Sequence, residues 1–224
     1  MSAATFDAII YNFGLFAVFV FALTGAVCAA KKELDIFAFI LAGVVTGIGG
    51  GTLRDVLLNI DQVFWIEDPA YLSICIFASV ITYYAAHWVV HLDKFLLWLD
   101  AAGIALFAVL GTQKAMLFGA PPLVAVVMGV MTSTIGSVLR DIIMQQRLVI
   151  FDPEIYVTAC LAGSTSYLAL IYLEVEPLTA TLIASSLAFA LRGFALALDI
   201  RFPSYQLSKL QSRELKKQQD SQEP

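Results

Sequence analysis

The chain has 224 residues, of which 60% are hydrophobic and only 14% are charged. Soluble domains carry about 25% charged residues, so a soluble globule of this composition would leave a large apolar surface in water. The composition therefore predicts an integral membrane protein. The net charge is only −5 and no basic patch lies outside the C-terminal segment, so nucleic acid is not an expected partner.

Hydropathy predicts an all-α membrane protein with seven transmembrane helices, because seven apolar segments approach the ~20 residues that cross a bilayer. In chain order they are Ile9–Ala30, Ile36–Leu58, Tyr71–Val90, Phe95–Thr112, Leu123–Met144, Ile155–Leu173 and Leu178–Asp199. Polar or proline-containing joints separate them. We expect one transmembrane domain over residues 1–203 and a polar, disordered tail over residues 204–224.

The distribution of Lys and Arg predicts an external N-terminus and a cytoplasmic C-terminus. In this orientation the outer side holds at most one basic residue, Lys114, whereas the joints and the tail on the inner side hold nine. The inner basic residues are Lys31, Lys32, Lys94, Arg147, Arg201, Lys209, Arg213, Lys216 and Lys217.

One motif occurs twice, in residues 43–59 and 129–145. Gly43, Val44, Thr46, Gly50, Leu53, Arg54 and Asp55 match Gly129, Val130, Thr132, Gly136, Leu139, Arg140 and Asp141 without a gap. Further matches before and after the motif predict two three-helix repeats, about 5–92 and 93–175, followed by a seventh helix at about 178–199. Because three is odd, the second repeat enters the membrane from the opposite side, which gives the inverted topology common in transporters.

Small residues gather near the middle of both repeated helices, where two roles compete. They allow close helix packing, or they allow a kink that frees carbonyl oxygens toward a water-filled route. The three consecutive glycines favour the second role, because freed carbonyls and hydroxyls replace part of the water shell of a monovalent cation. The expected pore-lining residues are Thr46, Gly49, Gly50, Gly51, Thr52, Thr132, Ser133, Thr134, Gly136 and Ser137.

The two Arg-Asp pairs, Arg54/Asp55 and Arg140/Asp141, are expensive in hydrocarbon and are predicted to lie ~20 Å apart along the membrane normal. Neighbouring residues on a helix diverge by about 100°, so we expect no bridge within either pair. One interpretation is a snorkelling Arg with a satisfied Asp that holds the bundle together. The other is a polar lock at each mouth of a pore, which the repetition at symmetric depths favours.

Two further cations have alternative roles. Lys114 is an interfacial anchor or a modulatory cation at the outer mouth, and Arg192 snorkels or modulates conduction. His87 and His91 share a helical face without an evident third ligand, so no metal site is expected. The sequence contains no phosphate loop and no nucleophile with an orienting base, so we expect neither an enzyme nor a cofactor.

Residues Thr46 to Asp55, with the echo ending Leu139-Arg140-Asp141, resemble the bacterial branch of the TRIC family, the trimeric intracellular cation channels. The same superfamily includes bacterial proteins proposed to move glycine. The resemblance covers roughly residues 5 to 200. It implies seven helices, two inverted three-helix bundles, a homotrimer in the bacterial inner membrane, and a pore in each protomer that conducts potassium and other monovalent cations. The family's kinked glycines map to Gly49, Gly50, Gly51 and Gly136, although the second copy lacks the triple glycine.

Three functions follow as hypotheses. The first is a passive monovalent-cation channel, with potassium or sodium as the permeant ion and with membrane lipid and, by the resemblance, two further copies of the chain as partners. The second is a secondary transporter for a small zwitterion such as glycine, because half-helix N-termini bind carboxylates. The third is a non-conducting scaffold whose tail recruits a partner.

Overall fold

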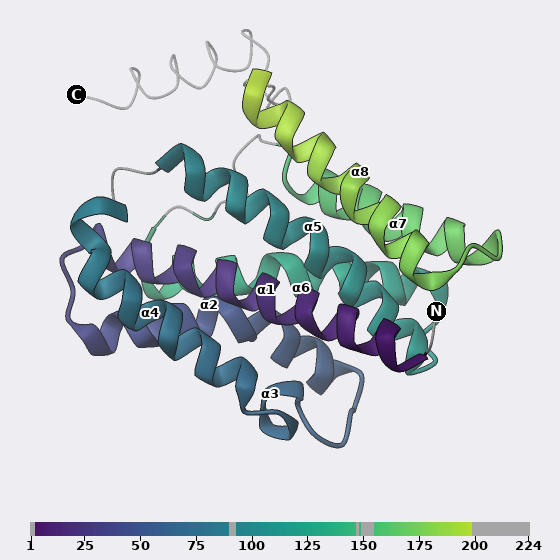
Figure 1. Ribbon diagram of the computed structural model, residues 1–224, viewed down its shortest axis with the longest axis horizontal. Coiled ribbons are helices and arrows are strands. Elements are labelled where there is room, and N and C mark those ends of the chain that lie inside the picture. The colour runs from purple at the N-terminus through teal and green to yellow at the C-terminus, as the bar shows by residue number, and fades with distance from the viewer. Residues whose placement is uncertain (1–2, 90–92, 147, 149–154, 199–224) are drawn as a thin grey trace, which may run out of the picture.

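The computed structural model describes residues 3–89, 93–146, 148 and 155–198, and these residues form eight α-helices and no strand (Figure 1). The helices are α1 (Ala3–Ala30), α2 (Ile36–Leu57), α3 (Phe64–Glu67), α4 (Ala70–Val89), α5 (Asp93–Leu117), α6 (Pro122–Ile143), α7 (Val157–Tyr172) and α8 (Pro177–Leu198). The predicted all-helical architecture is confirmed. The tail over residues 204–224 lies outside the described residues.

Five of the helices are long and apolar enough to cross a membrane: α1, α2, α4, α6 and α8. These five agree with five of the predicted spans. Helix α7 has only 16 residues. Helix α5 has 25 residues and continues five residues beyond the predicted end, through the polar pair Gln113-Lys114. Helix α3 is a four-residue turn inside a predicted joint.

The ends of α2 and α6 have the same local structure. In each, a residue with positive φ follows the helix, Asn59 (φ 53°) after α2 and Gln145 (φ 46°) after α6. The next amide N–H, of Ile60 or Gln146, donates to the carbonyl oxygen of Asp55 or Asp141 at 3.0 and 2.8 Å. This pattern satisfies carbonyl groups that a helix end leaves unpaired. Both Arg-Asp pairs therefore lie in the last turn of a helix that stops in the same way.

The long helices form two groups of three, with α8 outside them. Helices α1, α2 and α4 contact one another, and so do α5, α6 and α7. The groups meet where α1 contacts α5 and α2 contacts α6, and α8 packs on α5 and α7 (Figure 1). The rings of Phe21 in α1 and Phe107 in α5, which occupy matching positions in the two groups, stack with centroids 5.2 Å apart.

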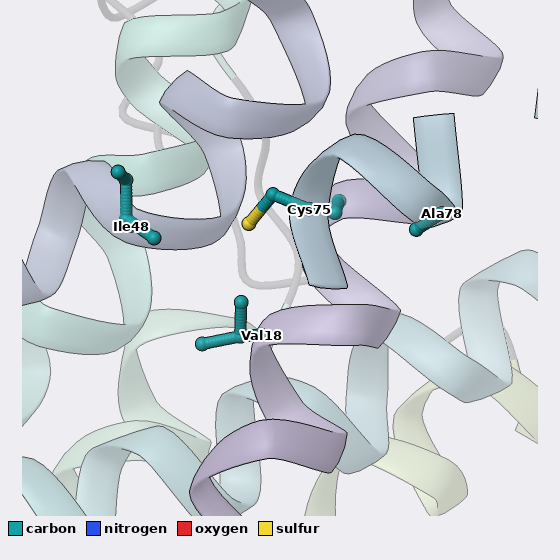
Figure 2. Packing of buried hydrophobic residues seen from close by; sticks show 5 residues of the cluster. Val18, Ile48, Cys75 and Ala78 are labelled. Carbon is teal, nitrogen blue, oxygen red and sulfur yellow. The ribbon is translucent and has the colours of Figure 1, made fainter. Parts of the chain in front are cut away.

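The core of the first group forms around a glycine and a cysteine. Cys75 of α4 is fully buried and points its sulfur between Ile48 of α2 and Val18 of α1 (Figure 2). A Cβ at Gly47 would lie 2.8 Å from this sulfur, which is closer than real Cβ contacts allow. Gly47 thus makes the space that Cys75 fills, and the three helices approach closely. The thiol is a packing group here.

Candidate functional site

The two repeated helices cross at their small residues. A Cβ on Gly50 of α2 would overlap the carbonyl oxygen of Thr132 in α6, and a Cβ on Gly136 of α6 would overlap the carbonyl oxygen of Thr46 in α2. From Thr46 to Gly50 the residue number rises along α2, while the number of the contacted residue in α6 falls from 136 to 132. The two helices are therefore antiparallel at this crossing. Each contact uses a glycine and a threonine from matching positions of the motif. The glycines allow the two backbones to touch.

Helices α2 and α6 are continuous α-helices through these positions. Neither helix is interrupted at its glycines, and the bend expected there stays a prediction. At Gly50 and Gly136 the space left by the missing side chains is filled by a neighbouring backbone. Of the two roles weighed for these glycines, close packing is the one that this geometry shows.

The hydroxyl groups at the crossing donate to carbonyl oxygens of their own helix. Thr46 Oγ1 donates to the Ala42 oxygen at 2.6 Å, and Thr132 Oγ1 donates to the Met128 oxygen at the same distance. Such bonds satisfy the hydroxyl proton but leave oxygen lone pairs for another partner. The other predicted lining hydroxyls bond in the same way: Thr52, Ser133, Thr134 and Ser137.

Burial divides the predicted lining residues. Thr46, Gly50, Gly51, Thr132, Ser133, Thr134, Gly136 and Ser137 are buried, whereas Gly49 and Thr52 are half-buried. Gly49 faces the Leu139 side chain, and Thr52 accepts a hydrogen bond from Trp65 Nε1 at 3.0 Å. Ser137 Oγ lies 3.1 Å from the Tyr156 hydroxyl, which ties α6 to the start of α7.

Each Arg-Asp pair is bridged within its own helix. Arg54 Nε and Nη2 lie 2.8 and 2.7 Å from Asp55 Oδ1, and the distances from Arg140 to Asp141 are the same. The prediction of no bridge between these neighbours is wrong. Cβ directions do diverge by about 100°, but the long arginine stem lets the guanidinium fold back over the last turn. Neither arginine snorkels, since they are only 7% and 8% exposed.

Asp55 has two more partners that the sequence did not predict. Its Oδ2 accepts a hydrogen bond from the Phe64 amide at 3.0 Å and contacts Lys114 Nζ at 3.0 Å. Lys114 is therefore a second cation on a fully buried carboxylate. Arg54 Cζ and Lys114 Nζ both lie over the Phe64 ring, 5.9 and 5.7 Å from its centroid. Gly51 makes room for this ring, because a Cβ there would lie 2.6 Å from Phe64 Cε1.

A pocket of about 320 Å³ opens beside this carboxylate. It reaches from Tyr11 near the start of α1, past Arg54 and Lys114, to Thr132 at the α2–α6 crossing. We call this end of the bundle the Arg54 end. Four predicted residues line the pocket: Gly51, Arg54, Lys114 and Thr132. The pocket also contains residues that were not predicted to line a site, above all Gln113 and the rings of Tyr11, Phe64, Tyr71, Phe107 and Phe118.

Hydrogen bonds connect the start of α4 to α1 beside the pocket. The Tyr11 hydroxyl donates to Asp68 Oδ2 at 2.7 Å, and the Ala70 amide donates to Asp68 Oδ1 at 3.0 Å. The hydrogen bond from the Ala70 amide, followed by that from Tyr11, lowers the pKa of Asp68 below its ordinary value. Both bonds favour the charged carboxylate.

Arg192 does not line the pocket and does not snorkel. It is 2% exposed, its guanidinium carbon lies 5.2 Å from the centroid of the Tyr156 ring, and its Nη1 donates to the Ile155 carbonyl oxygen at 3.4 Å. The predicted snorkelling is wrong because the Tyr156 ring and the start of α7 enclose the guanidinium. Through Tyr156 and Ser137, Arg192 connects α8 to α6, the helix that carries the second Arg-Asp pair.

The histidine pair is only partly described, because His91 lies outside the described residues. Within the described ranges, no group of three or more His, Cys, Asp and Glu side chains is arranged to hold a metal ion. The polar groups that the two repeated helices do bring together are buried hydroxyl and carbonyl groups, which lie between the Arg54/Asp55/Lys114 cluster and the Arg140/Asp141 cluster.

A protein-family model described as "Glycine transporter" matches this chain twice, over residues 11–87 and 97–172. The chain belongs to this family. In this glycine transporter family member, the first match covers most of α1, α2, α3 and α4, and the second covers most of α5, α6 and α7. Each match thus corresponds to one three-helix group, and α8 lies outside both.

Three relatives show how far the similarity extends. The UPF0126 inner membrane protein YadS of Escherichia coli K12 is 34% identical over 203 residues, which are 90% of this chain and 98% of YadS. The TRIC trimeric intracellular cation channel orthologue of Rhodobacter sphaeroides is 41% identical, with a TM-score of 0.83 over 86% of this chain and 99% of that chain. A prokaryotic TRIC channel in 0.5 M KCl is 25% identical, with a TM-score of 0.80 over 86% and 98%. The resemblance to bacterial TRIC proteins is confirmed.

Proposed function

We propose that this protein is a monovalent cation channel, permeable to potassium, with one path through each protomer between α2 and α6. The observation that carries the proposal is the pocket that leads from the Arg54 end to Thr132 at the helix crossing. The solved relative at 41% identity is described as a cation channel orthologue and the one at 25% identity as a TRIC channel, which supports the same function.

The middle of the path is the α2–α6 crossing, which is closed in this structure. Thr46 and Thr132 are only 2% and 3% exposed, and the two backbones touch at the glycines. A small separation of the helices exposes hydroxyl oxygens and carbonyl groups of both threonines to the path. Such hard oxygen dipoles replace part of the hydration shell of a monovalent cation.

The two ionic clusters act as polar locks at the ends of the path. Arg54, Asp55 and Lys114 hold one end, and Arg140 and Asp141 hold the other. Lys114 modulates the first end directly, because it contacts the carboxylate. Arg192 modulates the second end indirectly, through Tyr156 and Ser137.

The membrane arrangement that accompanies this function is an inverted repeat. The double match to one family model and the reciprocal contacts of Gly50 with Thr132 and of Gly136 with Thr46 support it. With α5 and α7 as the remaining spans, seven helices cross an inner membrane over residues 1–203, with the N-terminus outside. Trimeric assembly is proposed because the Rhodobacter relative is described as trimeric.

Single-channel recording in planar lipid bilayers tests the proposal. Purified protein is expected to give resolved potassium currents, and Thr132→Val is expected to lower the unitary conductance. Thr165→Val is the matched control, because Thr165 is exposed and donates to its own helix at the Leu161 oxygen. The opposing outcome is saturable uptake of labelled glycine into proteoliposomes without unitary currents. That result would support the transport activity after which the family model is described.

A further inference from the structure

The pocket at the Arg54 end has the dimensions and lining of a small-molecule site. Its volume of about 320 Å³ falls in the range of roughly 300–1,000 Å³ typical of ligand pockets, which are mainly apolar with a few polar groups. The body of the pocket is apolar and aromatic. Its main apolar lining residues are Ile10, Phe64, Phe107, Leu110, Leu117 and Phe118.

One side of this pocket is cationic. Arg54 and Lys114 both line it, and both contact the fully buried Asp55. Two cations thus share one carboxylate at this position. Glu67 also attracts Lys114, but it is exposed to solvent on α3. A guanidinium has five N–H donors and an ammonium has three, so the contacts with Asp55 leave donors for a second anionic group.

A buried acceptor without a partner lines the same pocket. Gln113 is 7% exposed, and its Oε1 makes no hydrogen bond. A buried acceptor left unsatisfied costs free energy, and an N–H or O–H group entering the pocket would remove that cost. Gln113 and Lys114 are consecutive residues of α5 and both line the pocket, so the acceptor and the ammonium group lie at the same level of this helix.

We propose that this pocket is a receptor site for an amphipathic monocarboxylate that carries a hydrogen-bond donor. Its carboxylate pairs with Arg54 and Lys114, its donor bonds to Gln113 Oε1, and its apolar body lies among the aromatic rings. The site does not suit glycine, because a zwitterion without a side chain leaves the apolar lining unfilled. Binding itself is independent of the proposed channel function. Block of conduction rests on that function, since the ligand would occupy the path above Thr132.

Binding to the full-length protein in lipid nanodiscs tests the site without any flux measurement. Indole-3-acetate is the probe because it has a carboxylate, an aromatic body and an N–H donor. Naphthalene-1-acetate lacks the donor, indole-3-ethanol lacks the carboxylate, and glycine lacks the apolar body. We expect saturable binding of indole-3-acetate by calorimetry, with each of the other compounds about tenfold weaker or more, the change that loss of one such contact produces.

Two variants separate a built site from partition into lipid. Gln113→Leu is expected to remove the preference for indole-3-acetate over naphthalene-1-acetate, and Lys114→Met is expected to weaken both acids by about tenfold. Gln146→Leu, outside the pocket, is the control and should bind as the native protein does. Equal binding of all compounds, or an unchanged preference in Gln113→Leu with native-like helix content, would overturn the proposal.

Electrophysiology then distinguishes this inference from the function on which the block rests. If indole-3-acetate binds and potassium currents exist, they should fall with the same concentration dependence as binding. Saturable binding to a protein without currents would support the site and contradict the channel. Currents without any saturable binding would contradict the site alone.

Discussion

Gly50 of α2 lies directly against the carbonyl oxygen of Thr132 in α6, with no room for a Cβ between them. The same relationship recurs, with the partners exchanged, between Gly136 and Thr46. These two contacts bring the halves of the protein together at its centre. The close spacing between α2 and α6 therefore depends on Gly50 and Gly136, which carry a hydrogen atom where alanine would carry a methyl group.

Gly50→Ala is expected to force the two helices apart and to destabilise the protein by about 1–3 kcal/mol, as overpacking does in a filled core. Thermal unfolding in detergent measures the effect. The matched control is Gly49→Ala, whose Cβ would meet mainly the flexible Leu139 side chain at 3.0 Å. Equal stability of the two variants would contradict the close crossing.

Asp55→Asn is expected to destabilise the protein by about 3–5 kcal/mol, because it leaves two buried or half-buried cations without their shared counter-charge. Asp55 is fully buried, and Arg54 and Lys114 both contact it. Asp35→Asn is the control, because Asp35 caps α2 by accepting from the Ala38 amide and asparagine caps equally well. A fall in melting temperature of the same size in both variants would contradict the shared ion pair.

Asp68 gives a small pH dependence of known sign. Its pKa in the folded protein is lowered by the Ala70 amide and the Tyr11 hydroxyl. The stabilisation is therefore fully present above the ordinary aspartate pKa of about 3.9 and is lost as the pH falls through the lower folded value. The melting temperatures of the native protein and Asp68→Asn should differ most near pH 6, and the difference should shrink as the pH falls below about 4. A difference that grows on acidification would contradict this assignment.

A thiol-labelling experiment tests the predicted orientation in the membrane. A variant with Cys28, Cys75 and Cys160 replaced by alanine and Ser221 replaced by cysteine carries one thiol, in the tail that holds four Lys and Arg residues. A membrane-impermeant maleimide is expected to label it only after the cells are permeabilised, because basic segments stay in the cytoplasm. Labelling of intact cells would reverse the predicted orientation.

Much of the architecture was predictable from local patterns. The lengths of the apolar segments predicted the helices, and the repeated Gly and Arg-Asp motif identified α2 and α6 as equivalent elements. Both signals are local, because membrane-length apolar segments must satisfy their backbone hydrogen bonds internally as helices. The four-residue α3 was missed, since its formation depends on Asp55 accepting the Phe64 amide from outside the segment.

The composition and the repeated motif determined that this is a helical membrane protein with two matching halves, because apolar length and periodicity are encoded residue by residue. Only the tertiary structure decided what the glycines and charges do. The glycines at 50 and 136 face a neighbouring backbone, Lys114 reaches across from α5 to Asp55, and Tyr156 encloses Arg192. These three contacts depend on which helix lies opposite and on how a long side chain bends. The spacing of residues along one helix predicts neither of these two things.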